Sequence, residues 1–136
     1  MTQSINIYSK SDSSLGRFLS NFTEWHVYVP QLGNFYSIEG LWYYLKASED
    51  SDREPLRLMH GAEAKSYGRK LPVGDFRPDF KDIICSAIEQ KIVNSPYFEE
   101  FKASTLPFEH YYVTAEGKII KTKQENMWVI EFISNL

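Results

Sequence analysis

The chain has 136 residues, a formal net charge of −3, and 43% apolar, 24% charged and 15% aromatic side chains. This size and composition indicate one globular domain over residues 1–136, large enough to bury a core without a disulfide or a metal. The negative charge argues against a protein that coats nucleic acid by bulk attraction, but it does not exclude an enzyme that meets nucleic acid at one pocket.

The N-terminal third predicts strands and loops. Ile5–Ser9 and His26–Val29 alternate or are rich in β-formers, which is typical of strands. The segment between them, residues 9–22, is polar and predicts turns.

The middle of the chain predicts helices, because caps and apolar stripes recur there. Ser37 is a good N-cap, and Ser95-Pro96 has the pattern of an N-cap followed by a proline in the first helical position. The expected helices are Ile38–Ser48, Ala62–Arg69, a long one from Asp79 to about Asn94, and one ending at about Ala103.

The C-terminal part predicts a hairpin and a closing helix. Two β-rich runs surround Glu116-Gly117 in HYYVTAEGKIIKTK, and Glu125–Ser134 has helical apolar spacing. The expected fold class is therefore α+β, mostly helical, with a small antiparallel sheet.

Three further patterns limit the class of protein. Cys85 is the only cysteine, which excludes an internal disulfide and predicts a cytoplasmic location. The start of the chain, MTQSINIYSK, lacks the apolar core of a signal peptide, and no 18-residue apolar run predicts a membrane span. The three histidines have no ligand spacing, so we expect neither a metal nor a cofactor.

One carboxylate and one amine stand out in the aromatic stretch FYSIEGLWYYLKA. Glu39 and Lys46 are seven residues apart, so a helix would place them on nearly the same face, roughly 10 Å apart along its axis. We expect Lys46 to be partly desolvated by its apolar neighbours, which would favour a neutral, nucleophilic amine. Glu39 could then transfer protons. A structural alternative is that the methylenes of Lys46 cover aromatic rings while its ammonium stays in water.

Other candidate residues also have structural alternatives. Asn21 could bond a base edge or ribose, or only form a turn. Arg69 could clamp a phosphate, or only favour the end of a helix. Trp42, Tyr43 and Tyr8 could stack on a purine, or only fill the core.

Five segments in order resemble one known family. INIYSKSD, LSNF, SIEGLWYYLKA, AEAKSYGRK and SAIEQKIVNSPYFEEFKAST are similar to the NADAR superfamily, the NAD- and ADP-ribose-associated domains. The resemblance covers about Ile5 to Thr105 well and the last thirty residues poorly. It implies the NADAR fold, which is also that of a bacterial N-glycosidase acting on riboflavin-pathway intermediates.

The resemblance assigns roles to particular residues. Glu39 and Lys46 match the family's catalytic pair, and Ser20, Asn21 and Phe22 match its SNF element. Gly68 and Arg69 match its Gly-Arg pair. A histidine of the family is replaced by Gly40, and a tryptophan is matched by Phe76. The Asp-x-x-Trp-Gly segment near the family's C-terminus is absent, and Asn126 stands in for the asparagine that follows it.

The activity implied is hydrolysis of an N-glycosidic bond between ribose and a base through a lysine Schiff base. ADP-ribosylated guanine in DNA is the expected substrate, so the chain would reverse a toxin-made modification in bacteria or phage. A small-molecule N-glycosidase acting on riboflavin intermediates and a non-catalytic module that binds ADP-ribose or a nucleotide are the alternatives. The sequence leaves the oligomeric state open.

Overall fold

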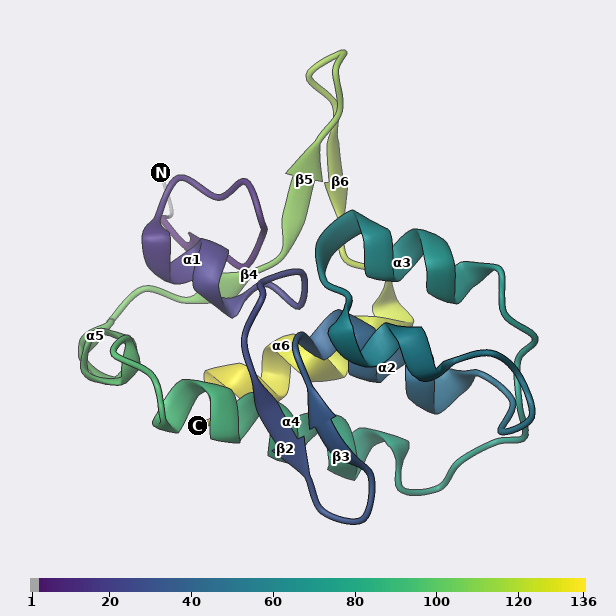
Figure 1. Cartoon of the computed structure of the whole chain (residues 1–136). Coiled ribbons are helices and arrows are strands. Elements are labelled where there is room, and N and C mark those ends of the chain that lie inside the picture. The colour runs from purple at the N-terminus through teal and green to yellow at the C-terminus, as the bar shows by residue number, and fades with distance from the viewer. Residues whose placement is uncertain (1–2) are drawn as a thin grey trace. The chain divides into compact units, whose positions relative to one another are not determined.

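The computed structural model describes residues 3–136, which form an α+β fold with small sheets (Figure 1). The chain groups into two compact units. The first unit combines the chain up to Ser20 with Ile92–Leu136, and the second is Asn21–Lys91. The prediction of one domain over residues 1–136 is not decided by this grouping.

The second unit is built around the helix α2. In chain order it contains β2 (Val27–Val29), β3 (Gly33–Phe35), α2 (Ile38–Lys46), the 3-10 helix η1 (Glu54–Leu58), α3 (Gly61–Arg69) and most of α4 (Phe80–Val93). α2 contacts α3, η1 and β3. Its Ile38, Leu41 and Leu45 are buried because they recur at helical spacing on the side that meets these elements.

The first unit is assembled from both ends of the chain. It contains β1 (Ile5–Asn6), α1 (Ser14–Leu19), α5 (Phe98–Ala103), β4 (Phe108–Glu109), β5 (Tyr111–Val113), β6 (Ile119–Lys121), the 3-10 helix η2 (Gln124–Asn126) and α6 (Met127–Ser134). β1 pairs with β4 in parallel, with Ile5 opposite Phe108. α1 contacts β1 and α6 contacts β4, and they supply buried Leu15, Phe18, Ile130 and Ile133.

The expected small antiparallel sheet is confirmed in part. The described residues contain three two-stranded sheets: β2–β3 and β5–β6 are antiparallel, whereas β1–β4 is parallel. The parallel pair joins segments about a hundred residues apart, and local sequence patterns contain no signal for such a pairing. The hairpin around Glu116-Gly117 is confirmed, with Gly117 at φ +82°, a left-handed conformation that suits glycine.

The helix predictions are confirmed for α2, α3, α4 and α6 within a few residues. The helix expected from Ser95 begins only at Phe98, because the Ser95 hydroxyl donates to the Ile92 carbonyl and accepts from the Tyr97 N–H in a turn. The turn-prone segment before residue 22 contains α1 instead of only turns. There Ser13 accepts a hydrogen bond from the Gly16 N–H at 3.0 Å and caps the helix.

Candidate functional site

The N-terminal end of α2 is held by a short network of hydrogen bonds. The Ser37 hydroxyl accepts from the Gly40 N–H at 2.9 Å and donates to the Met59 carbonyl at 2.8 Å. The Glu39 N–H donates to the Asn21 carbonyl at 2.9 Å. The Gly61 N–H, at the start of α3, donates to the Phe22 carbonyl at 2.9 Å. The predicted residues Asn21 and Phe22 therefore connect the first turns of α2 and α3.

Glu39 is buried at this end of α2 and is the most strongly perturbed carboxyl of the site. Glu39 is 9% exposed, and desolvation raises the pKa of its carboxyl from 4.5 to about 7. The positive charges of Lys65 and Arg69 lower this pKa, but by less than desolvation raises it. An acid with this pKa is populated in both protonation states near neutral pH, which suits proton transfer. The cations that act on Glu39 lie on α3.

α2 and α3 approach closely beside Glu39. A Cβ added to Gly68 would lie 2.4 Å from the Cβ and Cγ of Tyr43, so the ring of Tyr43 occupies the space that a larger residue would need. Burial and the Glu39 charge raise the pKa of the Tyr43 phenol. Three candidate residues, Glu39, Tyr43 and Arg69, are thus brought together at one helix–helix seam. Arg69 itself is exposed.

Lys46 has a different environment, and its expected desolvation is wrong. The residue is exposed, and its Nζ lies 5.6 Å from the centroid of the Trp42 ring. α2 ends at Lys46, with Ala47 already in an extended conformation, so no further helical turn covers the side chain. The side chain leans toward the N-terminus of the helix, as is usual, so its ammonium lies over a residue one turn nearer to Glu39.

Residues 71–79 form a loop that is hydrogen-bonded to the end of α2 and the residues after it. The Gly74 N–H donates to the Lys46 carbonyl at 2.8 Å, and the Ser48 N–H donates to the Pro72 carbonyl at 2.9 Å. Phe76 is 88% exposed on this loop. The ring of Trp42 packs edge-on against Phe80, with centroids 5.0 Å apart. The Trp42 ring therefore contacts both Phe80 and the Lys46 ammonium.

Gly40 stands at a position where the structure leaves no room for a larger residue such as histidine. A Cβ there would lie 2.4 Å from the Leu56 carbonyl oxygen and 3.2 Å from that of Met59. α2 and η1 can thus pack this closely because Gly40 has no side chain. A residue with a Cβ at position 40 would require η1 to move.

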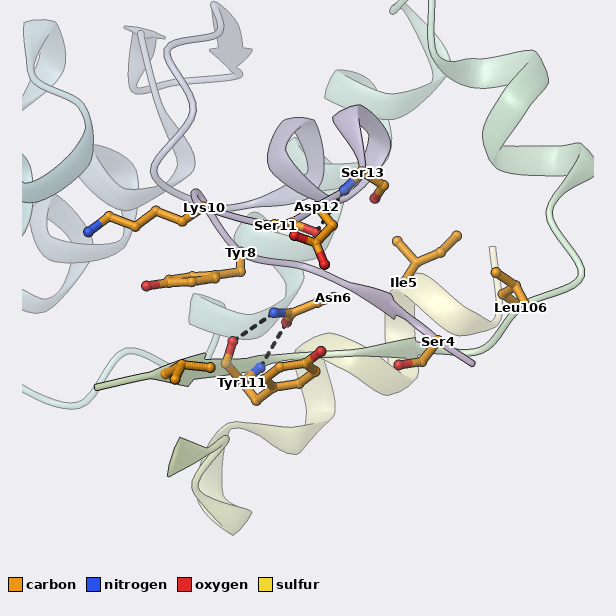
Figure 2. Close-up of a pocket in the computed structure, with 11 residues that line it drawn as sticks. Ser4, Ile5, Asn6, Tyr8, Lys10, Ser11, Asp12, Ser13, Leu106 and Tyr111 are labelled. Carbon is orange, nitrogen blue, oxygen red and sulfur yellow. Dashed lines mark hydrogen bonds between the residues drawn. The ribbon is translucent and has the colours of Figure 1, made fainter. Parts of the chain in front are cut away.

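Two predicted residues belong to the first unit. Asn126 is the N-cap residue of α6, where its side chain makes no capping hydrogen bond. Tyr8 lines a pocket with a volume of about 430 Å³ (Figure 2). The pocket is formed by β1, the segment after it, Leu106 and β5, and its polar lining includes Ser4, Asn6, Lys10, Asp12 and Tyr111.

Lys91 is a further candidate residue that was not predicted from the sequence. It lies on α4 and is 2% exposed, and desolvation lowers the pKa of its amine to about 7. A signal was available, because Lys91 shares the apolar face of the helix with Ile84 and Ile88, at i+7 and i+3 from them. This buried amine has the depressed pKa that a nucleophilic lysine needs.

Within residues 3–136 there is no group of three or more His, Cys, Asp or Glu side chains arranged to hold a metal ion. The described helices include none that is both long and apolar enough to cross a membrane. In comparisons with protein-family models, curated proteins and solved structures, nothing matched this chain.

Proposed function

We propose that the chain is an N-glycosidase that hydrolyses the bond between ribose and base in ADP-ribosylated guanine of DNA, and that it acts in the cytoplasm. The observation that carries this proposal is the Glu39 carboxyl, buried at the start of α2 with a pKa of about 7 beside the cationic Lys65 and Arg69. Such a carboxyl can protonate a leaving base, while neighbouring cations favour a substrate with phosphates.

Lys46 would be the nucleophile of this reaction. Its amine would bond to the ribose C1 while the C1–base bond breaks, and protonated Glu39 would give its proton to the departing base nitrogen. The sugar ring would open to a Schiff base, and water would then release ADP-ribose and restore the amine. Because Lys46 is exposed, the bound substrate itself would have to exclude water from the amine. A guanine in a duplex would first have to be unpaired or flipped out.

Covalent trapping tests this mechanism. A single-stranded oligonucleotide carrying ADP-ribosyl-guanine is incubated with the protein and cyanoborohydride, and the adduct is located by peptide mass spectrometry. We expect release of ADP-ribose and a reduced adduct on Lys46. Lys46→Ala should abolish both, whereas Lys70→Ala, which removes another exposed lysine, should leave both unchanged. A Lys46→Ala protein that still cleaves would disprove the lysine mechanism.

A non-catalytic binding module is the second candidate. Two observations favour it: Lys46 is exposed, and the space beside Gly40 is too small for a larger side chain. This module would hold ADP-ribose or a nucleotide through Arg69 and Tyr43. Calorimetric titration with ADP-ribose separates the two candidates. Tight binding without release of ADP-ribose from modified DNA, and without release of the sugar from a riboflavin-type glycoside, would support the module and contradict the enzyme.

A further inference from the structure

The β5–β6 hairpin is a basic element in an acidic chain. Residues 110–123 contain Lys118, Lys121 and Lys123 against the single acid Glu116, a net charge of +2. Because the whole chain carries −3, the remaining residues carry −5. The hairpin extends away from β4 and α6 of its own unit (Figure 1), and all three lysines are exposed. Positive charge is thus concentrated where a polyanion can reach it.

A partly exposed aromatic cluster lies on one face of this hairpin. Tyr112 is 42% exposed, and its ring centroid is 6.3 Å from that of Tyr8, which is itself 6.3 Å from the imidazole of His110. In the β5–β6 pairing Tyr112 is opposite Ile120. Two residues further along the chain from Tyr112, the Thr114 N–H donates to the Lys118 carbonyl, so Thr114 is opposite Lys118. Side chains two residues apart share a face, so Lys118 lies on the Tyr112 face.

The base of the hairpin is firmly attached to β1. The Asn6 amide donates to the Tyr111 carbonyl and accepts from the Tyr111 N–H, both at 2.9 Å (Figure 2). His110 Nδ1 donates to the Ile7 carbonyl at 2.5 Å. These bonds fix the start of β5 beside the segment that carries Tyr8, so the aromatic rings keep their mutual positions without a ligand.

Lys10 adds a second cation next to Tyr8. Both line the 430 Å³ pocket, and Figure 2 shows the Lys10 side chain extending in the same direction as the Tyr8 side chain. Tyr8, Lys10, His110, Tyr112 and Lys118 are called the aromatic–lysine surface below. They combine rings able to stack with ammonium groups on the segment after β1 and on the hairpin.

We infer that the aromatic–lysine surface binds single-stranded nucleic acid, with bases stacked on Tyr112 and Tyr8 and phosphates near Lys10 and Lys118. Alternating aromatic and basic side chains on an open surface are the usual means of binding a single strand without reading its sequence. An acidic protein partner would bind the lysines but would provide no bases to stack on the rings of Tyr112 and Tyr8. The biological part of this inference rests on the proposed function, because the surface would hold the polymer that carries the modified base.

Binding of unmodified DNA tests the surface apart from catalysis. Fluorescence anisotropy is measured with a short oligothymidylate and with an abasic oligonucleotide of equal length, which keeps the phosphates but lacks bases. We expect the oligothymidylate to bind more tightly. Tyr112→Ala should weaken it by about 5- to 100-fold and leave the abasic strand almost unaffected, since one base stack is lost.

The lysines are tested by salt dependence. Lys10→Gln with Lys118→Gln should reduce the slope of log Kd against log salt by about 1.4, because each phosphate contact on a single strand contributes about 0.7. The matched control, Lys70→Gln with Lys102→Gln, removes the same charge from exposed positions elsewhere and should not change the slope. Circular dichroism of each variant checks folding.

Three results would overturn the inference: equal affinity for the abasic strand, competition by polyglutamate as strong as that by oligothymidylate, or normal binding by Tyr112→Ala. ADP-ribose release from a modified guanosine without a polymer is measured in parallel. Failure of that release with normal oligothymidylate binding would contradict the glycosidase alone, whereas the reverse outcome would contradict the surface alone.

Discussion

The two ends of α2 carry charges seven residues apart that have opposite environments. At the N-terminal end Glu39 is buried by the contact with α3, and desolvation raises its pKa to about 7. At the C-terminal end Lys46 is exposed, because the helix stops there, and Trp42 lies beneath its ammonium. Helical spacing therefore predicts which residues share a face, but the elements that cover each turn decide whether a charged side chain is buried.

The largest expected effect is on catalysis by Glu39. Glu39→Gln keeps the size of the side chain but cannot donate or accept the catalytic proton, so we expect ADP-ribose release to fall about 10²- to 10⁴-fold. Glu63→Gln, at an exposed position on α3, is the matched control and should retain activity. Single-turnover release measured by chromatography gives the rates, and an unchanged rate for Glu39→Gln would remove this carboxyl from the mechanism.

Glu39, at the buried end of α2, should also make the stability of the protein depend on pH. The Glu39 pKa is about 7 in the folded chain against an ordinary value of 4.5 for the unfolded chain, so its contribution is fully present below pH 4.5 and is lost as the pH rises through 7. The shift corresponds to about 3 kcal/mol of unfolding free energy. Urea unfolding between pH 4.5 and 8 should show this decline in the natural protein relative to Glu39→Gln. Parallel profiles for the two proteins would mean that Glu39 is not desolvated.

A methyl group at the seam should separate α2 from α3. Gly68→Ala places a Cβ 2.4 Å from Tyr43, and we expect a loss of about 1–3 kcal/mol of stability from overpacking despite the better helix propensity of alanine. Thermal unfolding measures the loss. Ser66→Ala, at an exposed position on the same helix, is the control and should change stability by less than about 0.5 kcal/mol. A stabilised Gly68→Ala protein would show that the two helices are not in this contact.

Substitution of Arg69 should have a smaller effect, on the pKa of the Glu39 carboxyl. Because the Arg69 cation lowers the Glu39 pKa, Arg69→Gln should raise that pKa further and move the decline of stability to higher pH. NMR titration of a carboxyl-labelled glutamate follows Glu39 directly. A lower pKa in Arg69→Gln would contradict the proximity of the two groups.

Substitution of Lys46, at the exposed end of α2, should change the free energy of unfolding very little. Lys46→Ala removes a side chain that is in water apart from its contact with Trp42, so we expect a change within about 0.5 kcal/mol. Thermal unfolding beside the trapping experiment separates a chemical role from a structural one. A loss of several kcal/mol would mean that Lys46 is part of the core.

Local signals predicted the elements that carry the candidate site. Ser37 caps α2 as expected. The apolar stripe that predicted α4 consists of Phe80, Ile84, Ala87, Ile88 and Ile92, and all of these but Phe80 are buried. α1 was not predicted because its cap and apolar residues occur within a short, polar stretch. The β1–β4 pairing depends on contacts between segments far apart in the chain, which no local pattern records. The burial of Lys91, by contrast, agrees with its place on the apolar face of α4, beside Ile84 and Ile88.

The Asn6–Tyr111 double hydrogen bond has a consequence for the order of folding. It joins residues 105 positions apart, so the first unit has to wait for the C-terminal segment to leave the ribosome, whereas the contiguous second unit can fold earlier. Until that closure, Ile5, Ile7 and the apolar side of α1 lack their native cover. The nascent chain would therefore expose an aggregation-prone amino-terminal arm during synthesis, and slowing translation near the end should prolong that exposure.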